Sequence, residues 1–117
     1  MADEKQDLLP GTLELLVLKT LTNGALHGYA IVREIQRRSA DALTVEEGSL
    51  YPALHRMERR GWIDAEWGAS DTNRRAKFYA LTKLGRAELR SQTANWRRMS
   101  GAITQVLEAN LGHAAGA

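Results

Sequence analysis

The order in which helical and alternating hydrophobic patterns follow one another is the feature that most constrains the fold of this 117-residue chain. Apolar residues recur at helical spacing in three segments within about residues 9–60. Two short segments of alternating polar and apolar residues come next, at residues 62–67 and 76–81. Helical spacing then returns over residues 82–110. These patterns predict a mainly α fold with a small β-hairpin and one long C-terminal helix.

Capping and proline signals place the first three helices. The first helix is expected to start near Pro10, because a proline loses no hydrogen bond in the first helical turn. The second is expected at residues 28–39. Thr44 and Ser49 are alternative N-caps for the third helix, and Pro52 favours a start shortly before it.

The two alternating segments predict a hairpin that projects from the domain. Ile63, Ala65 and Trp67 fall on one face of its first strand. Residues 68–75 form a polar connection that is longer than a tight hairpin turn, so we expect its tip to extend into solvent. Thr82 is then expected to cap the last helix.

The last helix carries a heptad pattern that predicts a homodimer. Apolar residues spaced by seven and by three form one seam along it. A helix about 40 Å long that folded back on its own small domain would leave its far end unsupported, although this remains the alternative. The residues expected at the dimer contact are Leu15, Leu18, Leu89, Trp96, Met99, Ile103 and Val106.

The basic residues are concentrated in the second half of the chain. The formal net charge of +2 divides into −3 over residues 1–54, +6 over residues 55–98 and −1 over residues 99–117. A cluster of this kind is the electrostatic footprint of a protein that binds a polyanion. On charge alone, a solvated surface rich in arginine is the alternative.

Composition argues against several other classes. The absence of cysteine excludes disulfides, thiolate nucleophiles and cysteine-bound zinc, and fits a reducing cytoplasm. The acidic, polar N-terminus does not resemble a signal peptide, and no apolar run is long enough to span a membrane. The three histidines are far apart and no phosphate-binding loop or nucleophile motif occurs. We therefore expect no enzyme activity, no cofactor and no metal, with a metal-responsive regulator that uses His55 or His113 as the less favoured alternative.

Three helices followed by a hairpin is the order of a winged helix-turn-helix domain. In this fold the third helix lies in the major groove of DNA, and the hairpin, or wing, contacts the backbone or the minor groove. The basic residues Arg56, Arg59, Arg60, Arg74, Arg75 and Lys77 coincide with these two elements. A winged helix that binds only proteins would favour a neutral or acidic surface there. We expect a DNA-binding domain at residues 8–81, a dimerisation helix at 82–111 and a flexible tail at 112–117.

Several segments resemble the PadR-like transcriptional regulators. They are residues 26–31, 47–54, 56–63, 74–79 and 81–85. The Gly-Ser-Leu-Tyr-Pro-Ala-Leu segment is quite specific, whereas the Leu-Thr-x-x-Gly step also occurs in MarR-like proteins. The resemblance covers about residues 8–111, and the single C-terminal helix is similar to the short PadR subfamily. It implies a sequence-specific regulator that binds double-stranded DNA, and no cofactor.

The residues expected to contact DNA are His27, Tyr29, Ser49, Tyr51, Pro52, His55, Arg56, Arg74, Arg75 and Lys77. Arg56 is the best candidate for a guanine edge or a phosphate. For Arg59 and Arg60, pairing with a neighbouring glutamate is the favoured alternative. The resemblance favours Tyr51 as a DNA contact rather than a core residue, and places a backbone contact near His27, which is equally suited to cap a helix.

Trp96 and Met99 are candidate effector-binding residues. In some short PadR-like proteins such a tryptophan lines a hydrophobic pore at the dimer interface and stacks on flat aromatic ligands. An ordinary interface tryptophan is the equal alternative. The resemblance implies a repressor that a small aromatic effector releases from a pseudo-palindromic operator, with half-sites about 10 bp or a multiple of 10 bp apart.

Overall fold

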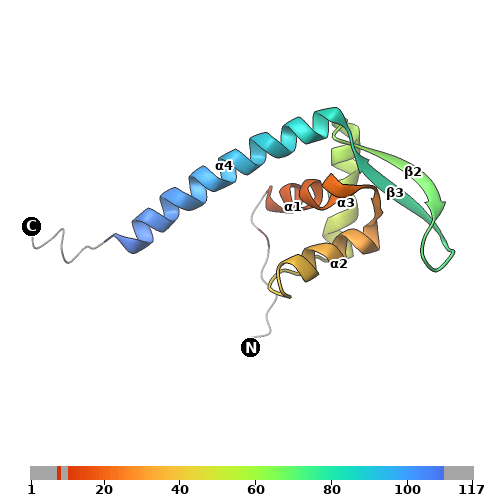
Figure 1. Ribbon diagram of the computed structural model, residues 1–117, viewed down its shortest axis with the longest axis horizontal. Coiled ribbons are helices and arrows are strands. Elements are labelled where there is room, and N and C mark those ends of the chain that lie inside the picture. Colours follow the sequence, from red (N-terminus) through yellow and green to blue (C-terminus); the bar gives the residue numbers. More distant parts are fainter. Residues whose placement is uncertain (1–7, 9–10, 110–117) are drawn as a thin grey trace, which may run out of the picture.

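The computed structural model describes residue 8 and residues 11–109 of the chain. Its elements are α1 (Thr12–Thr20), the 3-10 turn η1 (Leu21–Asn23), β1 (Leu26–His27), α2 (Gly28–Arg38), α3 (Glu47–Arg59), β2 (Ile63–Ala69), β3 (Arg75–Leu81) and α4 (Lys83–Glu108). Figure 1 shows α1, α2 and α3 clustered at one end, with the β2–β3 hairpin beside them and α4 running away from the cluster. The mainly helical fold with a long last helix is confirmed. Our expectations for Pro10 and for the tail at 112–117 lie outside the described residues. The last helix ends at Glu108, slightly before the predicted end, because the backbone of its C-cap residue Ala109 is extended.

The hydrophobic core joins the three N-terminal helices to the base of the hairpin. Its largest completely buried side chains are Leu18, Leu21, Ile31, Leu50, Leu54, Met57, Ile63 and Val17. One predicted dimer residue is corrected by this arrangement. Leu18 has no exposed surface, because α1 packs against both α2 and α3, so it belongs to the core and not to a contact with a second chain.

The sheet has three antiparallel strands in the order β1–β3–β2. β1 is a two-residue strand that the sequence did not predict, and it pairs Leu26 with Tyr79. The β2–β3 ladder extends to the pair Ala69 and Arg75, so the connection is the five residues 70–74 and not the predicted eight. The prediction followed the alternation of apolar side chains, which ends at Trp67. The hydrogen bonds of the ladder join backbone atoms and do not need this alternation, so the ladder continues through Gly68 to Ala69.

The start of α3 differs in detail from the prediction. Glu46 is the N-cap residue and makes no side-chain capping hydrogen bond, so neither Thr44 nor Ser49 caps the helix. Ser49 lies instead in the first turn, where its backbone N–H donates to the carbonyl oxygen of Glu46 at 3.0 Å. Pro52 is the sixth residue of α3 and so lies past the first turn, farther inside the helix than expected, where it cannot donate the usual hydrogen bond to the carbonyl oxygen of Gly48.

The junction between the hairpin and α4 is tightly packed. The Thr82 hydroxyl oxygen lies 2.6 Å from the Gly61 carbonyl oxygen and accepts a hydrogen bond from the backbone N–H of Gly85 at 2.9 Å, which confirms Thr82 as the cap of α4. A β-carbon at Gly85 would overlap the carbonyl oxygen of Trp62. The Leu-Thr-x-x-Gly step thus fixes the direction in which α4 leaves the domain.

Candidate nucleic-acid interface

α3 presents one exposed face that is free of the rest of the domain. The residues that it buries are Leu50, Ala53, Leu54 and Met57. The 3.6-residue period places Pro52, His55 and Arg59 on the opposite side, and all three are exposed. Within the described part of the chain, Arg59 forms no ion pair. Sequence reasoning left Arg59 out of the predicted contacts, although its spacing of seven and four residues from Pro52 and His55 was a usable signal.

One flank of α3 faces α1 and carries two paired arginines. Arg56 Nε lies 3.3 Å from Glu14 Oε2, and Arg60 Nη1 lies 3.7 Å from Glu14 Oε1. The Arg60 guanidinium also stacks on the Trp62 ring at 5.1 Å. Arg56, the arginine that we expected at a guanine edge or a phosphate, therefore lies beside the centre of the exposed face and has a carboxylate partner.

The opposite flank of α3 carries Tyr51, which packs against the start of α2. A β-carbon at Gly28 would lie 2.5 Å from the Tyr51 hydroxyl oxygen, so a larger residue there would displace the Tyr51 ring from its present position. The Tyr51 side chain is nevertheless partly exposed, unlike a core tyrosine. Partial burial, with a smaller effect of the Glu47 charge, raises the pKa of Tyr51. Its hydroxyl stays protonated at neutral pH and can donate a hydrogen bond to an anion.

The register of the hairpin separates basic from acidic side chains. In β3, Arg75 and Lys77 point to one face of the hairpin, whereas Phe78 points to the other. Trp67 of β2 lies on the same face as the two basic residues, and the Arg75 guanidinium stacks on its ring at 4.8 Å. Lys77 Nζ lies 3.7 Å from Glu58 Oε1 of α3, so this face is the one turned toward α3. Asp64 and Glu66 point to the other face. Arg74 lies in the exposed connection between the strands.

The start of α2 contributes one exposed aromatic side chain. His27 caps α2, since its Nδ1 accepts a hydrogen bond from the backbone N–H of Ala30 at 3.3 Å, and its ring meets Phe78 edge-on at 5.3 Å. The capping role, which the sequence left open, is thus observed. Tyr29 is largely exposed, with the Arg33 guanidinium 5.6 Å from the centre of its ring.

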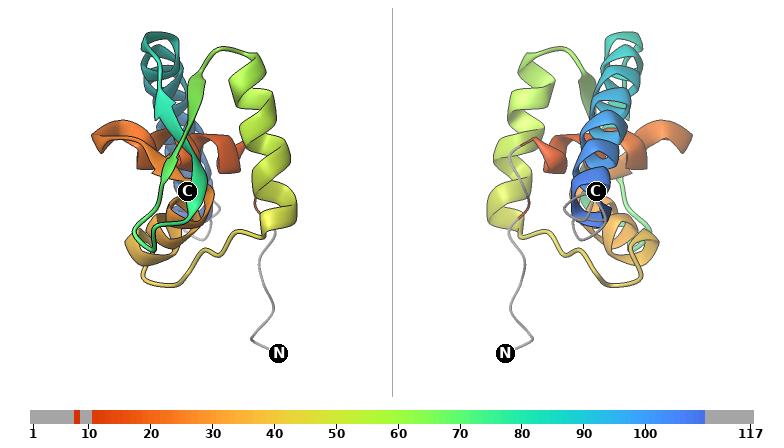
Figure 2. Two further views of the ribbon diagram at one scale, coloured as in Figure 1. Left: turned by 90° about the vertical axis from the view of Figure 1, so that its right-hand side faces the viewer. Right: turned by 90° about the vertical axis from the view of Figure 1, so that its left-hand side faces the viewer.

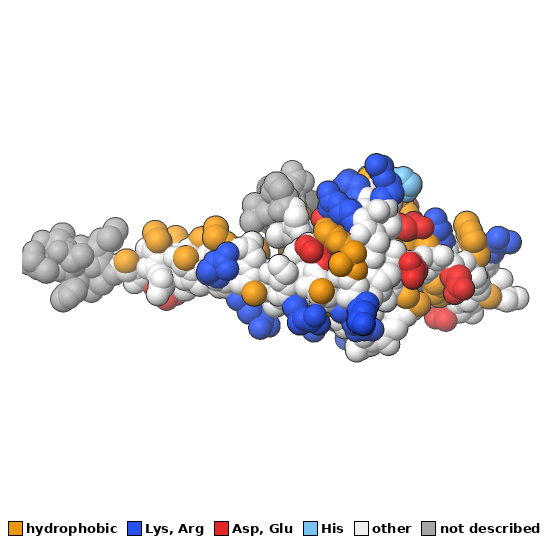
Figure 3. All heavy atoms as spheres, turned by 90° about the horizontal axis from the view of Figure 1, so that it is seen from above, with side chains coloured by type: hydrophobic (Ala, Val, Ile, Leu, Met, Phe, Trp, Pro, Cys, Tyr) orange, Lys and Arg blue, Asp and Glu red, His pale blue; other side chains and the backbone are white. Residues whose placement is uncertain are grey.

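Basic side chains cover two separate regions of the surface. Figure 3 shows one group beside a histidine at the edge of the molecule, and others along α4. The exposed basic residues of α4 are Lys83, Arg86, Arg90, Arg97 and Arg98. The basic residues of segment 55–98, whose net charge is +6, therefore lie on two surfaces. One is formed by α3 and the hairpin, and the other by α4.

An apolar groove runs between α1 and α4. Its volume is about 1000 Å³, and the side chains that line it include Leu15, Leu16, Leu89 and Trp96. Met99 lines a smaller hollow that also borders Trp96. Farther along α4, Ile103, Val106 and Leu107 are exposed. The heptad seam of α4 is thus uncovered over most of its length in one chain.

These features define the class of protein. Three helices, with a hairpin whose basic face adjoins the exposed face of the third helix, form a winged helix-turn-helix domain. Residues 17–91 match the model of the Transcriptional regulator PadR-like family. The chain therefore belongs to the PadR-like family, whose members are transcriptional regulators and not enzymes.

Relatives and solved structures agree with this assignment. The chain is 32% identical over 77 residues to a transcriptional regulator of Mycobacterium tuberculosis, covering 66% of this chain and 68% of that protein. A transcriptional regulator from Clostridium thermocellum matches with a TM-score of 0.76 at 25% identity, covering 86% of this chain and 97% of that one. A PadR family regulator from Eggerthella lenta matches with a TM-score of 0.72 at 31% identity, covering 86% and 85%.

Among residue 8 and residues 11–109, no group of three or more histidine and acidic side chains is placed to hold a metal ion, and His113 lies outside this part. No helix within the same residues is long and apolar enough to cross a bilayer.

Proposed function

We propose that this regulator is a homodimeric repressor that inserts α3 of each protomer into the major groove of a pseudo-palindromic operator. The observation that carries the proposal is the position of Arg59 and His55. They lie at the centre of the exposed face of α3, next to a hairpin face that bears Arg75 and Lys77. A duplex placed against α3 would meet the hairpin at the same time.

The contacts divide into base readout and backbone binding. Arg59 and His55 are central enough to reach base edges, and Pro52 offers an apolar surface to a thymine methyl group. Arg56 is better placed for a phosphate than for a guanine edge, because it lies on the flank next to α1. The remaining backbone contacts are assigned to Tyr29, Ser49, Tyr51, Arg74, Arg75 and Lys77, with His27 holding the start of α2 in place.

The homodimer is supported by the uncovered seam of α4. α4 has 26 residues, which corresponds to a length of about 39 Å. Exposed apolar residues continue along it as far as Val106 and Leu107, beyond the reach of its own domain. A second copy of α4 that covers this seam and the groove next to Leu15 would bury them without any additional protein. Two α3 helices related by twofold symmetry then require half-sites about 10 bp or a multiple of 10 bp apart.

The same region is the proposed effector site. Trp96 is partly exposed and lines both hollows, and Met99 lines one of them. A flat aromatic ligand that stacks on Trp96 would release the operator only by binding more tightly to a dimer geometry that does not fit DNA. A winged helix that binds only other proteins is less well supported, because the exposed face of α3 and the adjoining hairpin face are basic.

The proposal is tested by binding the protein to DNA from its own upstream region. A mobility-shift or anisotropy titration over a series of salt concentrations should give a steep loss of affinity as salt rises, and protection of two symmetric half-sites in footprinting. Sedimentation of the free protein should give the mass of a dimer. Weak binding that is equal for all sequences, or a monomer bound at one half-site, would contradict the proposal.

A further inference from the structure

We infer that Glu14 is a specificity-determining residue of this regulator, because it restrains Arg56 and Arg60 and so limits their binding to the phosphates of any DNA sequence. The inference rests on the proposed DNA-binding function and adds a role for a residue on α1, outside the helix-turn-helix itself. Glu14 acts on DNA through the two arginines, and is therefore a positioning residue rather than a DNA contact.

The contact joins two helices that are far apart in the sequence. Each oxygen of the Glu14 carboxylate faces one guanidinium, at 3.3 Å for Arg56 and 3.7 Å for Arg60. The Glu14 side chain is only 13% exposed, whereas those of Arg56 and Arg60 are 51% and 53% exposed. The carboxylate is thus held by the packing of α1, while the arginines extend from it toward solvent. Figure 2 shows α1 crossing between α3 and α4.

Each restrained arginine meets competition when a phosphate approaches. The phosphate must either displace the carboxylate or share the guanidinium with it, and the negative charge of Glu14 opposes its approach in both cases. A largely buried carboxylate cannot swing away as an exposed one does. Arg56 and Arg60 therefore contribute less to phosphate binding than two free arginines would.

Restraint of these two arginines favours specific over non-specific binding. Phosphate contacts contribute affinity to every sequence alike, whereas base contacts separate the operator from other DNA. Arg59, at the centre of the exposed face, has no carboxylate partner among the described residues and remains free to read bases. Glu14 thus lowers the sequence-independent part of the affinity and leaves the base contact intact.

The test compares the wild-type dimer with Glu14→Gln, which keeps the shape of the side chain but removes its charge. Affinities for the operator and for a random duplex of equal length are measured by anisotropy over a salt series. The variant dimer releases two arginines in each protomer, so the slope of log K against log salt on random DNA should steepen by up to about 3.6, since each phosphate contributes about 0.9. At 0.1 M salt this corresponds to a gain of up to about 4000-fold, if the contribution of these arginines vanishes at 1 M. The operator should gain less, so the ratio of the two affinities falls.

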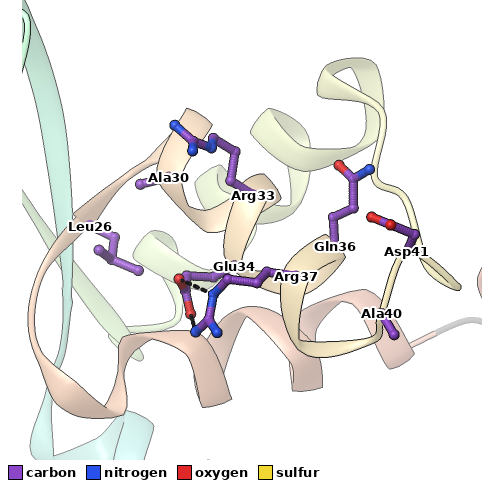
Figure 4. Close-up of a pocket in the computed structure, with 8 residues that line it drawn as sticks. All are labelled: Leu26, Ala30, Arg33, Glu34, Gln36, Arg37, Ala40 and Asp41. Carbon is purple, nitrogen blue, oxygen red and sulfur yellow. Dashed lines mark hydrogen bonds and ion pairs between the residues drawn. The ribbon is translucent and has the colours of Figure 1, made fainter.

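Glu34→Gln is the matched control. Glu34 also pairs with two arginines, Arg37 and Arg38, at 2.9 Å each, but on α2 and away from the exposed face of α3. Figure 4 shows its contact with Arg37. The control removes the same charge and frees the same number of arginines. It should leave both the salt slope and the affinity ratio as in wild type.

Removal of the arginines provides a second, independent measurement. The double variant Arg56→Ala, Arg60→Ala should have a small effect on random DNA binding in the wild-type background. In the Glu14→Gln background it should return the slope to the wild-type value. Circular dichroism melting of each variant verifies that the domain is folded.

The outcomes separate this inference from the proposed function. An unchanged slope and ratio in Glu14→Gln, or a loss of affinity for both duplexes, would overturn the restraining role while DNA binding by the wild type stands. Equal effects of the arginine substitutions in both backgrounds would overturn it as well. Absence of DNA binding by the wild type would overturn both proposals.

Discussion

Replacement of Ile103 by alanine is expected to weaken dimerisation without unfolding the winged domain. Ile103 lies in the distal half of α4, outside the hydrophobic core, and 53% of its surface is exposed in one chain. Alanine has the highest helix propensity, so α4 itself should persist. The substitution therefore reports on the covering of the seam by a second chain.

The size of the effect follows from the surface that the dimer would bury. Complete burial of an isoleucine side chain stabilises by about 1.5–3 kcal/mol, and about half of that surface is still available for the partner. After allowance for the β-carbon that alanine keeps, the loss is about 0.7–1.4 kcal/mol for each protomer. Twofold symmetry doubles it, so the Kd of the dimer should rise about 10- to 100-fold.

Sedimentation equilibrium over a dilution series measures this Kd directly. Gln105→Ala is the control, because Gln105 is exposed on the side of α4 opposite Ile103. It should leave the Kd of the dimer unchanged. An Ile103→Ala protein that dissociates at the same concentration as wild type would refute the assignment of the α4 seam to the dimer contact.

Three further predictions concern DNA reading, the hairpin junction and the effector. Arg59→Ala should lower operator affinity about 5- to 150-fold for each half-site and relax the sequence preference, whereas Arg86→Ala on α4, with the same change in charge, should do neither in an anisotropy titration. Gly85→Ala should lower the free energy of unfolding by about 1–3 kcal/mol in denaturant melts, because its β-carbon would overlap a backbone carbonyl oxygen. Gly101→Ala is the control: a β-carbon there has no atom within 4 Å, so the free energy of unfolding should stay unchanged or rise by up to about 1 kcal/mol. A flat aromatic effector should quench tryptophan fluorescence and weaken operator binding in wild type, with both effects lost in Trp96→Leu; quenching without any change in DNA affinity would contradict the coupling.

The fold was predictable because most of its elements carry local signals. The alternation around Ile63 and the cap at Thr82 depend on residues only a few positions apart, and both are present in the structure. The prediction failed where long-range pairing decides the boundary. The two-residue β1 exists only because β3 lies beside it, and Gly68 pairs within the ladder although the alternating pattern that indicates a strand ends at Trp67.

The candidate site was predictable as a set of residue types but not as a set of contacts. Charge along the chain placed the basic residues in the third helix and the hairpin. It could not show that Arg56 is restrained and Arg59 is not, because the deciding carboxylate, Glu14, is 42 residues from Arg56. The assignment of Leu18 failed for a related reason, since both sides of α1 are apolar and only packing shows which side is covered.

By itself, therefore, the sequence determined the order of elements, the heptad seam of α4 and the region where positive charge accumulates. These properties are set by spacing along the chain, which fixes which residues share a helix face or a strand face. Only the tertiary structure decided which arginines of α3 are free. Ion pairs and burial depend on distances across the packing of α1 against α3, and spacing within one element does not determine those distances.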